Sequence, residues 1–441
     1  MSTHVQTQRR TLRLTGFLAA WDQVIGGAGL PTLPRRRGRT PRVPLTDLVP
    51  ALTFHVMQGA GTLADHFFEL FGESLADSSW SDRRTRLPWE IFADLLRRAL
   101  RPRATRRHRE AFWRGWRLVA LDGTQFSLTN TPQVTGMVKK AKTRRGRAAF
   151  AKLTTNVLLE VGLHNPLAAA IGRGGESEWA LALQLLAQLP TRAVLLGDRL
   201  YGCAAFVTHA LAACERVGSH LLIRARTDIK ARVITRLADG SRLIDVRVRE
   251  RGRVIGSFEV REIRVRVGRP GHRAHDLRLW TSLLDPRTAP ALELATLYAR
   301  RWEHELYYRE LKRHLRKTDV LQSHTVETGA QDIAAMVLAS ALVAAERARV
   351  ATARIPPLRV SFVKVLQVVQ SMWLFFGVFE DLITARQKDQ IVRRGETLMR
   401  RFVTAKRRSR SCPRAVRQPV TGWPRLLRNE SIEGPLHFQV Q

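Results

Sequence analysis

The segment YARRWEHELYYRELK brings four side chains of complementary chemistry to one face of a predicted helix. At about 100° per residue, the three later members fall within roughly 60° of arc of the first tyrosine. The face would present a phenol, a guanidinium, a carboxylate and an ammonium, from Tyr298, Arg301, Glu305 and Lys312. Such a set suits a site where a metal held by carboxylate meets a phosphate held by cations. The alternative is an amphipathic surface helix with charge pairs.

Two aspartates add carboxylates at the ends of predicted buried strands. WRLVALDGT is an apolar run that ends in Asp122 and Gly123, and AVLLGDRLYG is a second run that ends in Asp198. In open α/β sheets an acid at the exit of a buried strand is exposed where ligands bind. A single Asp-Gly pair more often opens a turn or caps a helix. Two such acids and the helical face together indicate a site with three carboxylates.

The elements that must position these acids follow one another along the chain. Between the two aspartates, KLTTNVLLEVGL and PLAAAIGRG predict two strands of a meander joined by a turn at 164–166, and ESEWALALQLLAQL predicts a helix. Three strands, a helix and a fourth strand, with carboxylates on the first and fourth, form the layout of a ribonuclease-H-like domain. In that fold the two acid-bearing strands lie side by side.

The predicted fold class is therefore α/β. We expect a ribonuclease-H-like catalytic core, a mixed five-stranded sheet with flanking helices, interrupted by a β-rich insertion and bounded by helical N- and C-terminal regions. The predicted regions are a mostly helical DNA-binding region (1–110), the first part of the core (111–226), the insertion (227–283), the catalytic helix (284–325) and a helical region with a basic tail (326–441).

Two of these regions carry more specific expectations. The short helices of the N-terminal region could form a helix-turn-helix with Arg83, Arg84 and Arg86 near phosphates, or a plain helical bundle packed on the core. Arginine alternates with valine and isoleucine in the insertion, which predicts strands. Trp280 is the nearest aromatic there, although a tryptophan in a strand is more often part of the core. Tyr201 is also more readily explained by packing than by DNA contact.

The spacing of the first four residues resembles the signature of DDE transposases of the insertion-sequence-four superfamily. That signature is Tyr, two residues, Arg, three residues, Glu, six residues and Lys, and the chain matches it without a gap. The resemblance covers about residues 45–320. It implies that Asp122 and Asp198 join Glu305 as the catalytic triad. Glu303 and Glu310 compete for the third place, but they point about 140° and 120° from Tyr298.

The resemblance also implies the chemistry. The triad would bind two Mg²⁺ ions, with Mn²⁺ as a substitute, for cleavage and transfer of DNA strands in cut-and-paste transposition. Tyr298, Arg301 and Lys312 would contact DNA phosphates. The insertion would contact a DNA hairpin formed during excision. The alternatives are an inactivated, transposon-derived DNA-binding protein and a ribonuclease-H-like nuclease without strand transfer.

Composition points to a polyanionic partner independently of the motifs. The chain has 74 Lys plus Arg against 38 Asp plus Glu, a formal charge of +36. Basic clusters at 35–42, 139–147 and 393–428 suggest an extended binding surface for double-stranded DNA, which would include the ends of the element and the target DNA. Each cluster alone could instead be a solvated tail. The C-terminal helices are expected either to complete the core or to contribute to a homodimer that brings two ends together.

Cysteine content and hydropathy indicate the compartment. Three cysteines without metal-type spacing fit a reducing cytoplasm. The start lacks the apolar core of a signal peptide. The longest apolar stretch, IAAMVLASALVAA, has 13 residues and predicts a buried helix, not a membrane span. We therefore expect a cytoplasmic protein with no membrane partner, and the resemblance to insertion-sequence transposases implies a bacterial, nucleoid-associated one.

Overall fold

Two compact units make up the chain. The computed structural model describes residues 15–26, 30, 44–74, 76–143, 146–268, 274–316, 318–404 and 437–440. Unit 1 comprises Met1–Gln188 and Glu303–Val403, and unit 2 comprises Leu189–Trp302 and Thr404–Gln441. The predicted basic cluster at 35–42 lies outside the described residues, as do residues 144–145 of the second cluster and 405–428 of the third.

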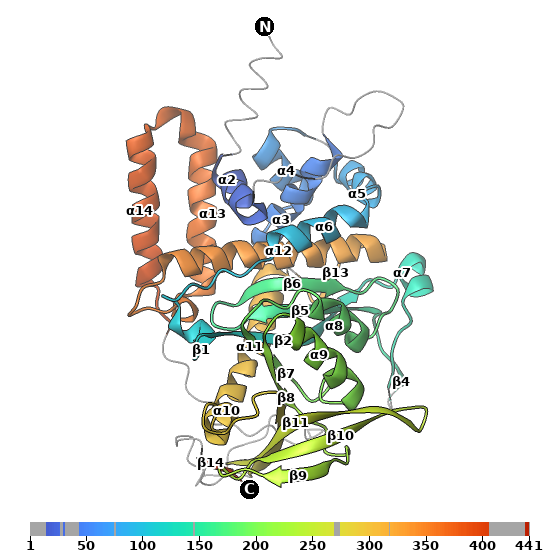
Figure 1. Cartoon of the computed structure of the whole chain (residues 1–441). Helices are drawn as coiled ribbons and strands as arrows, with labels where there is room; N and C mark the ends of the chain where they lie inside the picture. The colour runs from blue at the N-terminus through green and yellow to red at the C-terminus, as the bar shows by residue number, and fades with distance from the viewer. Residues whose placement is uncertain are drawn as a thin grey trace, which may run out of the picture. The chain divides into compact units, whose positions relative to one another are not determined.

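Helices from both ends of the chain form one layer of unit 1. Figure 1 shows the long helix α12 between the N-terminal helices and strand β6, and all three share one hydrophobic core. The α-helices are α2 (Thr15–Ile25), α3 (Leu48–Met57), α4 (Leu63–Phe71), α5 (Asp77–Thr85), α6 (Trp89–Ala99), α12 (Val326–Val350), α13 (Phe362–Phe379) and α14 (Ala385–Arg401). The 3-10 turns are η1 (Leu45–Asp47), η2 (Arg109–Ala111), η5 (Pro357–Arg359) and η6 (Glu380–Leu382).

Threonines start three of these helices. Thr62, Thr325 and Thr384 each accept a hydrogen bond from the third backbone N–H of α4, α12 and α14, and the side chain at that third position bonds back to the threonine N–H. This capping box satisfies two backbone donors that would otherwise lack a helical partner. The sequence therefore defines where these helices begin.

The strands of unit 1 form a sheet in the order β6-β5-β2. Neighbours in this run are antiparallel, and a parallel strand, β13, also pairs with β2. The strands are β1 (Phe112–Trp113), β2 (Trp116–Leu128), β5 (Lys152–Glu160), β6 (Asn165–Ile171) and β13 (Val320–Leu321), with a separate hairpin of β3 (Lys142–Thr143) and β4 (Gly146–Arg147). Helices α7 (Pro132–Met137) and α8 (Glu178–Leu186) also belong to unit 1. The predicted meander and the helix after it are confirmed.

Unit 2 contains a mixed sheet in the order β7-β8-β12-β11-β10-β9. Strands β7 and β8 are parallel and the later pairs are antiparallel. The elements are β7 (Ala193–Gly197), α9 (Ala204–Arg216), β8 (His220–Arg224), β9 (Arg232–Arg236), β10 (Arg242–Glu250), β11 (Arg253–Gly268), β12 (His275–Thr281), α10 (Ala291–Tyr298), η3 (Ala299–Arg301) and β14 (His437–Val440), which pairs with β11. Strands are therefore present over residues 232–281, whereas an insertion that interrupts a ribonuclease-H-like core stays a prediction.

The chain is a mixed α/β protein, as predicted. Along the sequence β2, β5, β6, α8 and β7 follow one another in the expected order. The ribonuclease-H-like assembly of a single five-stranded core and the five region boundaries stay predictions.

Helix α12 extends well beyond the apolar stretch on which its prediction rested. It runs for 25 residues and is long and apolar enough to cross a membrane, by length and composition alone. Of its most apolar window, however, 89% is buried inside the protein. The predicted buried helix is confirmed, whereas the judgement that it is too short to span a bilayer was wrong.

Arg84 makes internal contacts within unit 1. Its guanidinium donates to the Asp332 carboxylate at 2.6 Å and to the Thr328 carbonyl at 2.9 Å, both on α12. Arg83 lies over the Trp80 ring at 5.4 Å. These contacts fit the alternative of a helical bundle packed on the core, and the helix-turn-helix that contacts DNA phosphates stays a prediction.

Candidate active site

The predicted helical segment is divided among four elements. Helix α10 ends at Tyr298, the 3-10 turn η3 follows, α11 spans Trp302–Glu310, and the π turn η4 spans Leu311–Leu315. A 3-10 turn winds about 120° per residue and a π turn winds less than an α-helix. The uniform projection that put four side chains on one stripe therefore does not apply across the segment. Tyr298 and Arg301 belong to unit 2, and Glu305 and Lys312 belong to unit 1.

Asp122 lies in the middle of its strand and not at the end, as the sequence had suggested. Strand β2 continues for six residues beyond it because Gly123 to Leu128 keep pairing with β5 and its flanking residue Ala151. The Gly123 N–H donates to the Asp122 carboxylate at 3.0 Å. The aspartate side chain is thereby held on the strand face that looks toward α11.

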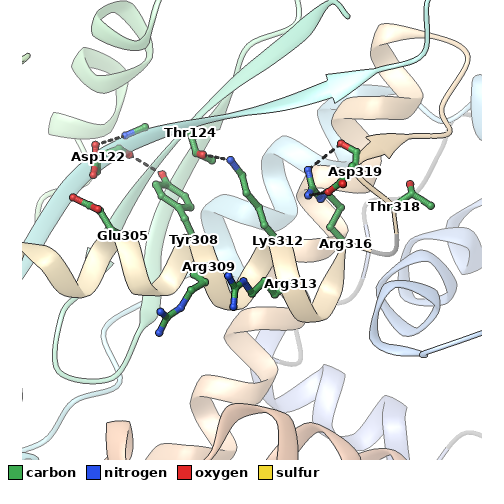
Figure 2. A pocket seen from close by; sticks show the side chains of 11 residues that line it. Asp122, Thr124, Glu305, Tyr308, Arg309, Lys312, Arg313, Arg316, Thr318 and Asp319 are labelled. Carbon is green, nitrogen blue, oxygen red and sulfur yellow. Dashed lines mark hydrogen bonds and ion pairs between the residues drawn. The ribbon is translucent and has the colours of Figure 1, made fainter. Parts of the chain in front are cut away.

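Asp122 and Glu305 face each other across a cleft of unit 1. Figure 2 shows the Glu305 side chain rising from α11 toward Asp122 on β2. The cleft has a volume of about 740 Å³. Its lining residues are Asp122, Gly123, Thr124, Glu305, Tyr308, Arg309, Lys312, Arg313, Arg316, Thr318 and Asp319. Two of the three predicted triad acids and the predicted lysine thus share one site.

Two hydrogen bonds join α11 and η4 to β2. The Tyr308 hydroxyl donates to the Asp122 carbonyl at 2.7 Å, and the Lys312 ammonium donates to the Thr124 hydroxyl at 2.6 Å. Four helical residues advance about 6 Å and two strand residues about 7 Å, so the two spacings match. The pairing aligns the helix along the strand and places Glu305 opposite Asp122.

Burial governs the protonation of both anchoring side chains. Burial raises the pKa of the Tyr308 phenol well above its usual range, so the hydroxyl stays a donor. Burial also lowers the pKa of Lys312, and the nearby charges of Arg316 and Lys152 lower it further. The ammonium lies 5.3 Å from the centre of the Phe126 ring, a favourable contact for a cation.

The glycine after Asp122 lies against the Glu178 side chain of α8. A Cβ on Gly123 would lie 2.4 Å from the Glu178 Cδ. A larger residue here would therefore require the Glu178 side chain to move. The Asp-Gly pair, which often marks a turn, is in this protein a feature of an extended strand.

The remaining predicted residues belong to unit 2. Asp198 directly follows β7, as predicted, and accepts a hydrogen bond from the Leu200 N–H at 2.6 Å. The buried Tyr298 hydroxyl donates to the Gly197 carbonyl at 3.2 Å. Burial raises the pKa of Tyr298 to about 12, although Arg301 opposes the shift. The tyrosine therefore contacts the strand end that carries Asp198.

Four residues whose roles the sequence left open now have defined places. Trp280 is fully buried with Arg278 over its ring at 5.2 Å, and Tyr201 is fully buried against Phe206, so both are core residues as expected. Glu303 and Glu310 bind His164 and not the cleft. The geometric choice of Glu305 over these two acids agrees with the cleft lining.

The donor set fits a hard divalent cation in part. Within the residues described, no group of three His, Cys, Asp or Glu side chains is gathered to hold a metal ion. Asp122 and Glu305 are nevertheless carboxylates in one cleft, and Mg²⁺ is commonly bound by one or two carboxylates plus substrate phosphates. Lys312, Arg309 and Arg313 supply cations for such phosphates, whereas the Arg316 guanidinium is paired with the Asp319 carboxylate at 2.5 Å.

Comparisons with known proteins agree on one family. The family model described as "Transposase DDE domain" matches residues 113–342, more than half of the chain. "Transposase InsG for insertion sequence element IS4" of Escherichia coli K12 is 27% identical over 233 residues, 52% of each chain. "Putative transposase InsZ" of the same strain is 26% identical over 202 residues, 46% of this chain and 58% of that one. The chain spans about half the length of the curated relatives it matches.

One solved structure is similar at a lower sequence identity. It is the cryo-EM structure of the piggyBac transposase synaptic complex with hairpin DNA, at 8% identity, covering 89% of this chain and 85% of that one, with a TM-score of 0.44.

Proposed function

The chain belongs to the Transposase DDE domain family, and we propose on this premise that it is the DNA transposase of an insertion sequence. It would bind terminal inverted repeats and catalyse metal-dependent DNA strand cleavage and strand transfer. The observation that carries the proposal is the cleft in which Asp122 and Glu305 face each other beside four cationic side chains. A formal charge of +36 supports DNA, both element ends and target, as the partner.

We propose Asp122, Asp198 and Glu305 as the residues that hold two Mg²⁺ ions, with Mn²⁺ as a substitute. When bound, the metal would activate water or a 3′ hydroxyl and stabilise the leaving oxygen during attack on a phosphodiester. The protein contributes by fixing its carboxylates: the Gly123 N–H orients Asp122, and the Leu200 N–H orients Asp198. The Asp198 assignment rests on the family motif and its place at the end of β7.

The cationic residues would hold the DNA backbone. Lys312 is placed by the Thr124 hydroxyl and points into the cleft, which suits a contact with a phosphate of the strand being cut. We propose Arg301 as a second phosphate contact. The proton of the Tyr298 hydroxyl is already donated to the Gly197 carbonyl, so we propose that Tyr298 acts chiefly by supporting the strand end before Asp198. We also propose that the protein acts on DNA as a homodimer, in the cytoplasm and associated with the nucleoid.

The first test is cleavage of a plasmid that carries the genomic flanks of the gene. Purified full-length protein is incubated with Mg²⁺ or Mn²⁺, and the parent is compared with Asp198→Ala. Double-strand breaks at the flanking repeats that disappear in the variant are expected. Binding without cleavage by the parent would favour an inactivated DNA-binding protein, and cleavage without joining to a target would favour a nuclease. Equal cleavage by both proteins would refute the role of Asp198.

Lys312→Met is expected to weaken DNA binding evenly across sequences and to slow cleavage less than loss of an acid does. Methionine keeps much of the volume beside Phe126 but removes the charge. The slope of log affinity against log salt concentration should decrease in magnitude by about one, the contribution of a single phosphate contact. Fluorescence anisotropy over a salt series measures this slope. Lys364→Met, outside the cleft on α13, is the matched control and should keep the parental slope. An unchanged slope for Lys312→Met would remove this lysine from the DNA contacts.

A further inference from the structure

A buried histidine holds the helix of Glu305 from behind. His164 lies in the turn between β5 and β6, and 2% of it is exposed. One ring nitrogen, Nε2, lies 2.9 Å from the Glu303 carboxylate, and the other, Nδ1, lies 2.7 Å from the Glu310 carboxylate. A neutral imidazole can donate from only one nitrogen, whereas ionised carboxylates only accept. Both bonds therefore form together when the ring is an imidazolium.

The environment of His164 agrees with this protonation state. Burial alone would lower the pKa of the imidazole, but the charges and hydrogen bonds of Glu310 and Glu303 raise it overall. Arg347 on α12 donates to both oxygens of the Glu310 carboxylate, at 3.2 and 3.3 Å, and its Nε bonds to the carbonyls of η5 and Val360. Two cations thus balance two carboxylates, and the cluster is fixed to α12.

The three glutamates occupy opposite sides of α11. Glu303 and Glu310 are seven residues apart, about 700° along an α-helix, so they lie within about 20° of one line, two turns from each other. Glu305 is about 200° from Glu303 and therefore points the other way, into the cleft. Because His164 holds two points on the back of the helix, rotation of α11 about its axis would break both bonds. Tyr308 and Lys312 hold the front at β2.

The arrangement around His164 carries costs in stability. His164 has a φ of +54°, a left-handed conformation that costs free energy for a residue with a side chain. Buried ion pairs are also weak stabilisers, since desolvation offsets much of their attraction. Their best supported benefit is to select one arrangement among several. Here the selected arrangement is the rotation of α11.

We propose that His164 is a positioning residue for the active site: by bridging Glu303 and Glu310 it fixes the rotation of α11 at which Glu305 faces Asp122. The inference rests on the proposed function, because Glu305 matters only if it binds the metal. It assigns a role to a residue 139 positions before Glu303, remote from the family motif. Partners that orient metal ligands typically alter metal affinity by about tenfold to a hundredfold when they are removed.

The test measures Mn²⁺ binding to the full chain by electron paramagnetic resonance, without turnover. His164→Asn removes the bridge, and asparagine tolerates the left-handed backbone. Glu303→Gln removes one carboxylate from a partly exposed position, so it serves if His164→Asn fails to fold. Each variant is expected to weaken Mn²⁺ binding about tenfold while DNA affinity stays parental. The double variant should be no weaker than the stronger single one, since both remove the same bridge.

A neighbouring buried ion pair provides the matched control. Glu160 is fully buried near the same turn, but its carboxylate accepts from Arg117, from the Arg103 and Ala104 N–H groups and from the Asn165 side chain, none of which is on α11. Glu160→Gln should lower the melting temperature without changing Mn²⁺ affinity. If His164→Asn and Glu303→Gln fold and bind Mn²⁺ with parental affinity, the positioning role of His164 is wrong, while the proposed function stands. If the parent shows no Mn²⁺ binding that Asp122→Asn removes, the proposed metal site fails and the inference falls with it.

Discussion

Asp122→Asn and Glu305→Gln should each reduce DNA strand cleavage by about a thousandfold. Both changes keep the size of the side chain and remove one negative charge from the cleft. A bound metal supplies several kcal/mol of charge stabilisation to the transition state. At about 1.4 kcal/mol for each factor of ten, the loss of about 4 kcal/mol gives this magnitude. Cleavage of end-labelled DNA under single-turnover conditions measures it.

DNA binding and folding should survive both substitutions. The bonds that join α11 to β2 use the Asp122 carbonyl and the Tyr308 hydroxyl, so the Asp122 side chain is not part of them. A mobility shift should therefore show parental affinity, and the melting temperature should be close to parental. Asp94→Asn, an acid on α6 of the same unit, is the control and should cleave normally. Near-parental cleavage by either cleft variant would exclude that carboxylate from the metal site.

Gly202→Ala is expected to destabilise unit 2 strongly. A Cβ at Gly202 would lie 2.0 Å from the Arg224 carbonyl oxygen and 2.8 Å from the Ala225 Cα, both backbone atoms. The glycine cannot easily move, since its carbonyl accepts from the Arg226 N–H at 3.0 Å. Overpacking of this kind costs about 3 kcal/mol or more. For a chain of 441 residues, with an unfolding entropy of about 2.1 cal/mol/K per residue, that corresponds to a fall in melting temperature of about 3 °C or more.

Differential scanning fluorimetry of the full chain measures the effect. Gly256→Ala is the matched control in the same unit, because nothing lies within 4 Å of the added Cβ. It should leave the melting temperature nearly unchanged. A parental melting temperature for Gly202→Ala would show that the backbone between Asp198 and β8 can shift. In that case the loop after Asp198 is less firmly placed than the contacts indicate.

The sequence predicted the main elements of the site through local patterns. Asp198 lies where a buried apolar run ends, because β7 is short and its five residues are all buried. Asp122 was misplaced at a strand end because an Asp-Gly pair usually marks a turn. The alternation of exposed and buried residues from Gln125 to Leu128 is the period-two signal that extends β2. Greater weight on that alternation would have located the strand correctly.

Other features depend on contacts that no local pattern contains. The bridge from His164 joins residues more than a hundred positions apart, and a lone histidine in a turn gives no sign of two distant carboxylates. The contacts of Arg84 could not be predicted from the sequence either, because its acceptors on α12 are equally remote. Tyr308 could have been found, since it lies one turn after Glu305 and one turn before Lys312.

The hydrogen bond from Tyr308 to β2 uses the backbone carbonyl of Asp122, which a change of the Asp122 side chain leaves in place. A gene copy that loses an acid of the cleft by point mutation should still encode a folded protein that occupies the same DNA. Such a copy would compete with intact copies in the same cell and act as an inhibitor in trans. We expect the number of inactive copies in a genome to restrain the mobility of the active ones.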